Sequence, residues 1–206
     1  MILGKGMLAS YFQDREDAIL FCSGVSDSGI SDDKEFVREQ QLLESIPKDR
    51  CVVYTSTLSA AIGQTPYQCH KLRMEILVKQ FPEHLIFRVG NLVGKNQRTC
   101  QFFPAMIQQI KNGYVKIKQC RRDLLGTWDF AQIVNEMLDS NDRGLYRVCS
   151  NDPPWVLDIV AELEKNLGVE CVKDVLPCDE PFVLEPDLIS GGSSYYMDVI
   201  KRYFAW

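Results

Sequence analysis

The first half of the chain alternates continuous apolar runs with segments of helical periodicity. The runs at 18–22, 51–55 and 84–89 have the length and composition of buried strands. The segments 32–46 and 66–80 lie between them and carry apolar residues at helical spacing. This alternation predicts a parallel sheet with helices on both of its faces.

The second half has a looser pattern and shows no linker between its elements. We expect further helices at 102–111, 128–138, 153–168 and 194–204. We expect further strands at 114–118, 144–149 and 169–175. Asn151 or Asp152 is the expected cap of the helix that begins at Pro153. The sequence therefore does not sharply define a boundary between a sheet domain and a C-terminal lobe.

The composition narrows the class of protein. Hydrophobic residues make up 46% and charged residues 25%, which is typical of a globular protein. The net charge of -5, without clustered Lys and Arg, argues against nucleic acid as a partner. Eight cysteines form no C-x-x-C pair and there are two histidines, so we expect no metal site and reduced thiols in a cytoplasmic protein. We see no signal peptide and no apolar stretch of membrane-spanning length.

A glycine loop follows the short apolar run 1–3. The segment Gly4 to Ala9 reads G-x-G-x-x-A and is expected to join a strand to a helix. Gly4 permits the tight turn, Gly6 lets the backbone approach a pyrophosphate, and Ala9 lets the helix pack closely on the strand. The pattern favours a nucleotide-binding loop over an ordinary strand-to-helix turn.

Tyr67 and Lys71 form a Y-x-x-x-K pattern near the start of a predicted helix. Residues four apart share one helix face, so both side chains should enter the same cleft. An ammonium group beside a phenol lowers the pKa of the phenol and makes it a usable general base. Thr55, Ser56 and Thr57 end a buried strand, where open parallel sheets bind ligands. Taken alone, each pattern also fits a surface pair or a loop that satisfies its own backbone.

The order of these motifs resembles the extended short-chain dehydrogenase/reductases, the NAD(P)-dependent sugar-nucleotide epimerases and dehydratases. The resemblance covers Met1 to about Val134 and includes an R-x-x-N-x-x-G pattern from Arg88 to Gly94. It implies an α/β, Rossmann-like parallel sheet with helices on both faces and a small C-terminal α+β lobe. We therefore expect residues 1–98 to form an abbreviated dinucleotide-binding core. Residues 99–206 would form a substrate-binding lobe interleaved with the last sheet strands.

The resemblance also assigns roles to residues. Thr57, with Ser56 as a close competitor, Tyr67 and Lys71 match the catalytic positions. The residues implied to bind NAD or NADP are Gly4, Lys5, Gly6, Met7, Leu8, Ala9, Ser23, Gly24, Val25, Thr55, Ser56, Tyr67 and Lys71. The residues implied to bind a nucleotide-sugar substrate are Ser26, Asn91, Arg122 and Asp129.

The chain is shorter than the family pattern near its start. Only about ten residues separate Ala9 from the strand that begins at Ala18, too few for a complete strand-helix-strand crossover. One interpretation makes 18–22 the second strand of the family, with Asp27 holding the ribose hydroxyls. The interpretation that we favour deletes the second and third strands and makes 18–22 the fourth. Deletion removes the walls around the adenosine half of the cofactor and leaves the strand at 1–3 near an exposed sheet edge.

These patterns favour an NAD(P)-dependent epimerase, dehydratase or reductase that acts on a nucleotide-activated sugar. The alternative is a non-catalytic nucleotide- or sugar-nucleotide-binding protein that has lost part of the cofactor site. A third hypothesis, in which Cys69 or Cys22 acts as a nucleophile, has little support because the neighbours Cys69 and His70 would not face each other on a helix. Family members often dimerise through the Y-x-x-x-K helix and its neighbour, so the resemblance is compatible with a homodimer.

Overall fold

The computed structural model describes residues 1–206 except 31, 151, 179–185, 190, 193 and 206. The chain forms two compact units, each made of two segments. Unit 1 comprises Met1–Val89 and Thr127–Arg147, and unit 2 comprises Gly90–Gly126 and Val148–Trp206. These two units are defined by packing contacts. The predicted boundary at residue 98 separates a cofactor-binding from a substrate-binding part, and it stays a prediction.

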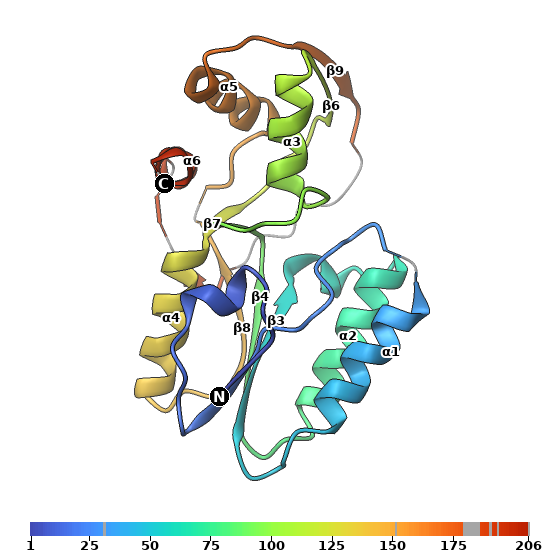
Figure 1. Cartoon of the computed structure of the whole chain (residues 1–206), viewed down its shortest axis with the longest axis vertical. Coiled ribbons are helices and arrows are strands. Elements are labelled where there is room, and N and C mark those ends of the chain that lie inside the picture. The colour runs from blue at the N-terminus through green and yellow to red at the C-terminus, as the bar shows by residue number, and fades with distance from the viewer. Residues whose placement is uncertain (31, 151, 179–185, 190, 193, 206) are drawn as a thin grey trace. The chain divides into compact units, whose positions relative to one another are not determined.

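Unit 1 is built on a sheet whose neighbouring strands run in the order β1-β2-β3-β4-β8 (Figure 1). Strands β1 to β4 pair in parallel, as the alternating pattern predicts. The bounds of the strands are β1 (Ile2–Leu3), β2 (Ala18–Phe21), β3 (Cys51–Thr57), β4 (His84–Val89) and β8 (Gly144–Cys149). The α/β, Rossmann-like fold class is therefore confirmed.

Helices cover both faces of this sheet. They are α1 (Asp33–Glu44), α2 (Pro66–Val78) and α4 (Thr127–Asp139). Ile19, Tyr54 and Ile86 of the strands form one buried cluster with Leu43 of α1 and Met74 of α2. On the opposite face, the buried ring of Phe87 meets Phe130 of α4 edge-on, with centroids 5.4 Å apart. Alternate residues of β4 thus face different helices, which explains why its sequence is apolar throughout.

The helix boundaries follow local chemistry. The Asp32 side chain accepts a hydrogen bond from the Lys34 N–H and starts α1. Thr65 and Gln68 form a capping box around Pro66, which starts α2. The segment after the glycine loop differs from the prediction. It forms only a four-residue 3-10 turn, η1 (Leu8–Tyr11), with no buried residue to hold a longer helix in place.

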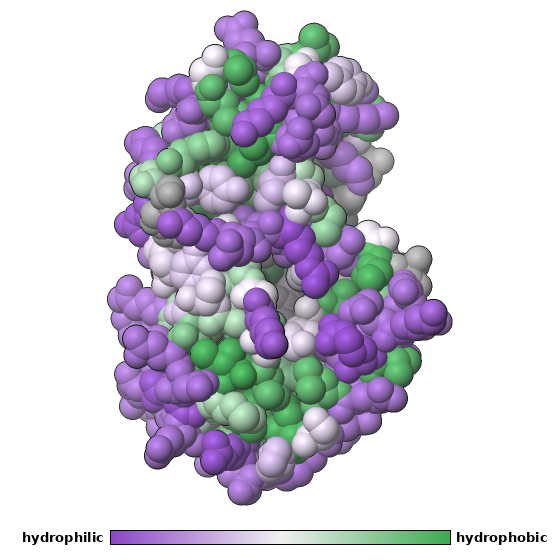
Figure 2. Space-filling model, in the orientation of Figure 1, coloured by the Kyte–Doolittle hydropathy of each residue, from purple (hydrophilic) through white to green (hydrophobic). Residues whose placement is uncertain are grey.

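The strand order shows which strands the chain lacks. In a complete doubly wound sheet the order is 3-2-1-4-5-6, so the first strand has the second on one side and the fourth on the other. Here β1 lies at the sheet edge and has β2 as its neighbour, followed by β3 and β4. This is the order 1-4-5-6, so the predicted absence of the second and third strands is confirmed. Figure 2 shows hydrophobic surface over the part of unit 1 where Figure 1 draws η1, β1 and β2.

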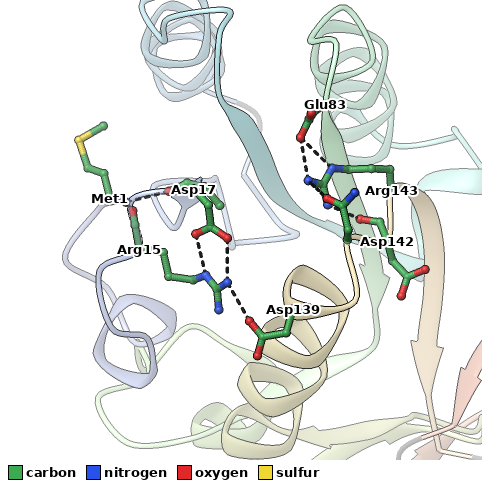
Figure 3. Close-up of polar contacts among 9 residues, drawn as sticks. Met1, Arg15, Asp17, Glu83, Asp139, Asp142 and Arg143 are labelled. Atoms are coloured by element: carbon green, nitrogen blue, oxygen red, sulfur yellow. Dashed lines mark hydrogen bonds and ion pairs between the residues drawn. The ribbon is translucent and has the colours of Figure 1, made fainter.

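The short connection at 12–17 stands where the missing strands would begin, and polar contacts fix it to the sheet edge (Figure 3). The Met1 ammonium donates hydrogen bonds to the carbonyl oxygens of Arg15 and, at 2.8 Å, of Ala18. The Ile2 N–H donates to Asp14 Oδ1 at 2.7 Å. This bond occupies a main-chain donor of the edge strand, which limits its use for pairing with another chain.

Unit 2 contains short parallel pairs of strands. The first pair is β5 (Asn91–Val93) with β7 (Leu124–Gly126), and the second is β6 (Tyr114–Lys118) with β9 (Val172–Leu176). Strand β10 (Leu188–Ile189) pairs with the last two residues of β8. The helices are α3 (Phe102–Lys111), α5 (Val156–Leu167) and α6 (Tyr195–Phe204).

The expected cap of α5 is wrong. The helix begins at Val156 with Trp155 as its N-cap residue, and Asp158 accepts a hydrogen bond from the Trp155 N–H at 3.3 Å. Asp152 instead pairs with Arg121 at 2.8 Å, and Asn151 lies outside the described residues. The helix ends as predicted at Gly168, whose φ of 67° is the left-handed conformation that favours glycine.

Candidate active site

The predicted cofactor segments of unit 1 meet at one edge of its sheet. The register pairs Leu3 with Phe21 and Phe21 with Tyr54, so β1, β2 and β3 reach their carboxyl ends side by side. The glycine loop follows β1 there and the segment 23–26 follows β2, while residues 55–57 are the last residues of β3. Ligands of open parallel sheets bind at this edge, so the topology supports the predicted site.

The glycine loop combines a tight turn with an open position. Gly4 has a φ of 129°, and a Cβ added to it would lie 2.5 Å from the carbonyl oxygen of Cys22. Only glycine therefore permits the loop to pack this closely on the end of β2. A Cβ at Gly6 would meet nothing within 4 Å, which leaves room for a ligand. The helix expected to face the pyrophosphate is replaced by η1, so main-chain N–H groups of the loop would have to bind it.

Tyr67 and Lys71 come together on α2 as predicted. The capping box places Tyr67 in the first turn of the helix, and Lys71 follows one turn later. The Lys71 Nζ lies 5.8 Å from the centroid of the Tyr67 ring. Tyr67 is half-buried, whereas Lys71 is 2% exposed. The sequence spacing thus correctly indicates a phenol beside an ammonium group.

A buried glutamate that the sequence analysis did not single out holds the Lys71 ammonium. Glu39 Oε1 accepts hydrogen bonds from Lys71 Nζ at 3.2 Å and from the Tyr54 hydroxyl at 2.7 Å. Lys71 also donates to the Tyr54 hydroxyl at 3.0 Å. Glu39 Oε2 lies 2.9 Å from His70 Nε2 and accepts from the Val25 N–H at 2.6 Å. We call these five residues the Glu39 cluster.

The sequence does contain a signal for Glu39. It lies three residues after Phe36 and four before Leu43, on the apolar face of α1. A charged residue on such a face needs a buried partner of opposite charge. The pattern predicts that a partner exists, but it does not say that the partner is Lys71, 32 residues away along the chain.

The charges of the cluster determine its ionisation. Burial alone would raise the pKa of Glu39, but the charge of Lys71 and the hydrogen bonds from His70, Val25 and Tyr54 lower it to about 2. Burial lowers the pKa of Lys71, and the charge of Glu39 opposes that effect. The pKa of Tyr67 is raised by burial and then by the charges of Glu39 and Asp27. The net shift of the Tyr67 pKa is thus upward, opposite in direction to the one expected from the Lys71 ammonium alone.

The segment after β2 covers this cluster. A Cβ added to Gly24 would lie 3.0 Å from Lys71 Nζ and 3.1 Å from Glu39 Oε1, so the backbone passes directly over the ion pair. The oxygen atoms of Ser23 accept hydrogen bonds from Arg38, and Val25 is buried with its N–H bound to Glu39. Ser26 is exposed. A side chain at position 24 would therefore press against the protein's own charges.

The hydroxyl groups at the end of β3 point in different directions. Ser56 is 4% exposed and donates to Glu75 of α2, which also binds Arg88 at 2.7 Å. Its hydroxyl is therefore occupied by an internal network. Thr57 is half-buried, and its Oγ1 lies 3.1 Å from the Ser59 hydroxyl at the start of η2 (Leu58–Ala61). Of the two competing hydroxyls, Thr57 remains the better placed to reach a ligand, and Thr55 is half-buried beside it.

The predicted substrate residues are divided between the two units. Ser26 and Asp129 belong to unit 1, and Asn91 and Arg122 belong to unit 2. The Asn91 side chain donates to the Asp123 carbonyl oxygen at 3.0 Å, beside the main-chain bond between the same residues. The Arg122 N–H donates to the Pro154 carbonyl oxygen at 3.0 Å. Within unit 2, β5 and β7 thus bring Asn91 near the segment that carries Arg122.

The cysteine hypothesis gains no support. Burial raises the pKa of Cys22 to about 12, so its thiol is not ionised near neutral pH. Cys69 donates to the Gly63 carbonyl oxygen, while His70 faces Glu39. Within the described ranges, no group of three or more His, Cys, Asp or Glu side chains is arranged to hold a metal ion. In the same ranges, no helix has the length and apolar character needed to cross a membrane.

A dinucleotide fits part of this site. Gly6 is open, Thr57 ends β3, and Tyr67 lies beside Lys71, whose ammonium reaches the segment after β2. These positions suit the pyrophosphate and nicotinamide ends of the cofactor. The strand order leaves no second or third strand to enclose an adenosine. Lys71, the residue expected at the nicotinamide ribose, is buried in the Glu39 cluster.

Solved structures of sugar-nucleotide enzymes share the fold. UDP-N-acetylglucosamine 4-epimerase from Methanobrevibacter ruminantium superposes with a TM-score of 0.69 at 15% identity, covering 92% of this chain and 76% of that chain. UDP-glucuronic acid 4-epimerase from Bacillus cereus, solved with NAD, gives a TM-score of 0.66 at 19% identity and covers 92% and 75%. dTDP-4-dehydrorhamnose reductase from Bacillus anthracis, solved with NADP, gives 0.65 at 15% identity and covers 92% and 80%. At these identities the likeness establishes the fold.

The family itself is established by sequence. A search of curated proteins gives no significant match. The family model described as "NAD dependent epimerase/dehydratase family" matches residues 7–149, which is more than half of the chain. NAD or NADP is thus the cofactor class of the family, as the sequence analysis expects, and the choice between them stays open. The chain belongs to the NAD dependent epimerase/dehydratase family.

Proposed function

We propose that this protein is an NAD- or NADP-dependent enzyme that acts on a nucleotide-activated sugar, with Tyr67 as its acid-base residue. The observation that carries this proposal is the position of Tyr67, one helical turn from Lys71 at the carboxyl edge of a sheet whose glycine loop is open at Gly6. Membership of the family supports the reaction class. Epimerisation, dehydration and reduction all belong to that class.

Different residues of this chain would bind the cofactor and transfer the proton. The loop from Gly4 to Ala9 would bind the pyrophosphate, and residues 23–25 with Thr55 would line the nicotinamide half. A bound nicotinamide supplies or accepts a hydride. Tyr67 would exchange a proton with the reacting sugar oxygen, and Thr57 would orient that oxygen. Lys71 would influence the Tyr67 phenol from its buried position in the Glu39 cluster.

The substrate proposal rests on the predicted residues Ser26, Asn91, Arg122 and Asp129. An arginine suits a nucleotide diphosphate because its guanidinium binds phosphate through two parallel hydrogen bonds. Two of the similar solved structures contain UDP-sugars, which supports a nucleotide-sugar ligand for this chain. A cytoplasmic location, expected from the reduced cysteines, and a homodimer, implied by the resemblance, belong to the same proposal.

Cofactor binding is the first test. NADH and NADPH are titrated into the protein and their fluorescence is followed. We expect saturable binding by the wild-type chain, weaker binding by Gly6→Val, because a branched side chain would fill the open position, and nearly unchanged binding by Tyr67→Phe. No binding of either dinucleotide at millimolar concentration would rule out the enzyme.

Turnover is the second test. UDP-, GDP- and dTDP-sugars are incubated with the protein and each dinucleotide. We expect turnover with at least one pairing and a loss of 100-fold or more in Tyr67→Phe, which is the usual contribution of a positioned acid-base group.

A second candidate function is a non-catalytic nucleotide- or sugar-nucleotide-binding protein. The lack of the second and third strands and the shortness of η1 favour it, because both reduce the contacts available to the cofactor. Binding of a dinucleotide or a nucleotide-sugar without turnover in any pairing would select this function over the enzyme.

A further inference from the structure

The Glu39 cluster gathers polar groups from four segments of unit 1 around one carboxylate. Glu39 comes from α1, Tyr54 from β3, His70 and Lys71 from α2, and Val25 from the segment after β2. The carboxylate is 0% exposed and both of its oxygens accept two contacts. Such complete pairing fixes the position of the negative charge next to the Lys71 ammonium.

This pairing changes what Lys71 can do to Tyr67. A lone ammonium about 6 Å from a phenol favours the phenolate by a factor of ten or more. With a carboxylate 3.2 Å from the ammonium, the two charges form a compact dipole, and most of that effect is cancelled.

The other charged groups near Tyr67 do not restore a positive field. Asp27 and Glu39 both act on Tyr67 as negative charges. Arg38 is a further cation on α1, and its guanidinium binds Glu35 and the oxygen atoms of Ser23. His70 and Tyr54 both face Glu39. The surroundings of the phenol therefore favour its neutral, protonated form.

We propose that Glu39 is a positioning residue that pairs with Lys71, keeps the Tyr67 phenol protonated, and so prepares the site to give a proton to a sugar carbonyl. This inference rests on the proposed function and refines it to the reductive direction. A site that begins by oxidising a sugar hydroxyl needs a phenolate to take the proton. A site that begins by reducing a carbonyl needs the phenol itself.

The proposed step balances. The carbonyl carbon of the sugar accepts the hydride of the reduced dinucleotide, which becomes oxidised. The π pair of the carbonyl moves to its oxygen, and that oxygen takes the proton of the Tyr67 hydroxyl to form an alcohol. Tyr67, left as a phenolate, regains its proton from water.

The test measures the protonation of Tyr67 without any cofactor. The tyrosines are labelled with ¹³C at Cζ, the Tyr67 resonance is assigned by its absence in Tyr67→Phe, and its shift is followed by NMR from about pH 6 to about pH 10.5, beyond the ordinary tyrosine pKa. We expect no titration of Tyr67 in the wild-type chain over this range. In Glu39→Gln, which keeps the shape but removes the charge, we expect Tyr67 to titrate within this range.

Two variants separate the charge effect from general damage. Glu44→Gln changes an exposed glutamate of the same helix and should leave the Tyr67 titration unchanged. The double variant Glu39→Gln/Lys71→Met removes both charges, remains foldable even if a lone buried lysine is not, and should show no titration of Tyr67, as in the wild type.

The outcomes are distinct. Ionisation of Tyr67 within this range in the wild-type chain would overturn the proposal, as would a Glu39→Gln variant that shows no titration or a double variant that titrates like the single one. Because no dinucleotide is present, a failed cofactor titration does not affect this result. In a chain that does turn over, Glu39→Gln should move the pH optimum of carbonyl reduction downward.

Discussion

Two buried carboxylates, one in each unit, show opposite behaviour. Glu39 of unit 1 is 0% exposed and Asp123 of unit 2 is 2% exposed. Glu39 has an ammonium partner and three hydrogen-bonding neighbours, and its pKa is lowered to about 2. Burial raises the pKa of Asp123 to about 6, although the hydroxyl and N–H of Ser150 donate to its Oδ1. Partners, and not burial, decide whether a buried carboxylate keeps its charge.

The second carboxylate oxygen of Asp123 accounts for the difference between the two pKa values. Among the described residues, Asp123 Oδ2 has no hydrogen-bond partner. It lies against Gly90, where an added Cβ would be 2.7 Å away. Glu39 is therefore a permanent charge that can orient Lys71, whereas Asp123 changes its charge close to neutral pH.

The largest expected effect on stability comes from removing the Glu39 carboxylate, which is the counter-ion of Lys71. Glu39→Ala leaves the buried ammonium without a counter-ion, and we expect the free energy of unfolding at pH 7 to fall by about 3–5 kcal/mol. Urea unfolding followed by circular dichroism measures the change. The matched change Glu44→Ala, on the exposed side of α1, should cost less than about 0.5 kcal/mol.

The pH dependence identifies the cause. Since the pKa of Glu39 is lower in the folded state, its contribution is complete above an unfolded pKa of about 4.5 and is lost as the pH falls toward 2. Glu39→Ala should therefore differ less from the wild type at pH 3 than at pH 7. A difference that is the same at both pH values would mean that packing, and not charge, is responsible.

Asp123 gives the next largest effect, with the opposite sign of pH dependence. Its pKa is raised from 3.8 to about 6 by folding, so its charged form disfavours the folded state. The destabilisation is absent below about pH 4, grows as the pH rises to 6, and then stays constant at about 3 kcal/mol. Asp123→Asn should remove this slope, as measured by urea unfolding at several pH values between 4 and 8.

Ser150 supplies the control for that slope. Ser150→Ala removes the hydroxyl that donates to Asp123 Oδ1 and leaves the N–H donor in place. With one bond to the carboxylate lost, the pKa of Asp123 should rise further and the slope should extend to higher pH. If wild type, Asp123→Asn and Ser150→Ala have parallel stability profiles, Asp123 is not the group that titrates.

The sequence predicts the elements of this fold well because their signals are local. The apolar runs of β2, β3 and β4, the capping residue Asp32 and the Pro66 start of α2 each act within a few residues. Where the signal depends on packing, the prediction fails. The helix expected after Gly6 shortens to η1 because no residue of that segment is buried.

The site is predicted less completely than the fold. The Tyr67–Lys71 spacing identifies two side chains that do come together. It does not show that the ammonium faces Glu39, because that contact joins α1 to α2 across 32 residues. An expectation based on the pair alone therefore gives the wrong direction for the pKa of Tyr67. The missing partner is a tertiary feature that helical spacing cannot contain.

Gly24 offers a smaller change to the same cluster. In Gly24→Ala, the new methyl group would lie 3.0 Å from Lys71 Nζ and 3.1 Å from Glu39 Oε1, so both side chains must move. We expect a loss of about 1–2 kcal/mol in the free energy of unfolding, together with a changed Tyr67 resonance. Gly6→Ala is the matched control, because a Cβ there meets nothing within 4 Å and should cost less than about 0.5 kcal/mol.

Exposed carboxylates with a good partner complete the comparison and give the smallest effect. Arg15 binds Asp17 and Asp139 at 2.8 Å each, with the two carboxylate side chains 55% and 66% exposed (Figure 3). Water and salt screen such pairs, so Arg15→Ala should lower the free energy of unfolding by less than about 1 kcal/mol. Raising the salt concentration to about 1 M should remove most of that difference but leave the effect of Glu39→Ala largely intact. A salt-resistant loss of several kcal/mol in Arg15→Ala would mean that its contacts hold the 12–17 segment over the sheet edge more firmly than two surface ion pairs can.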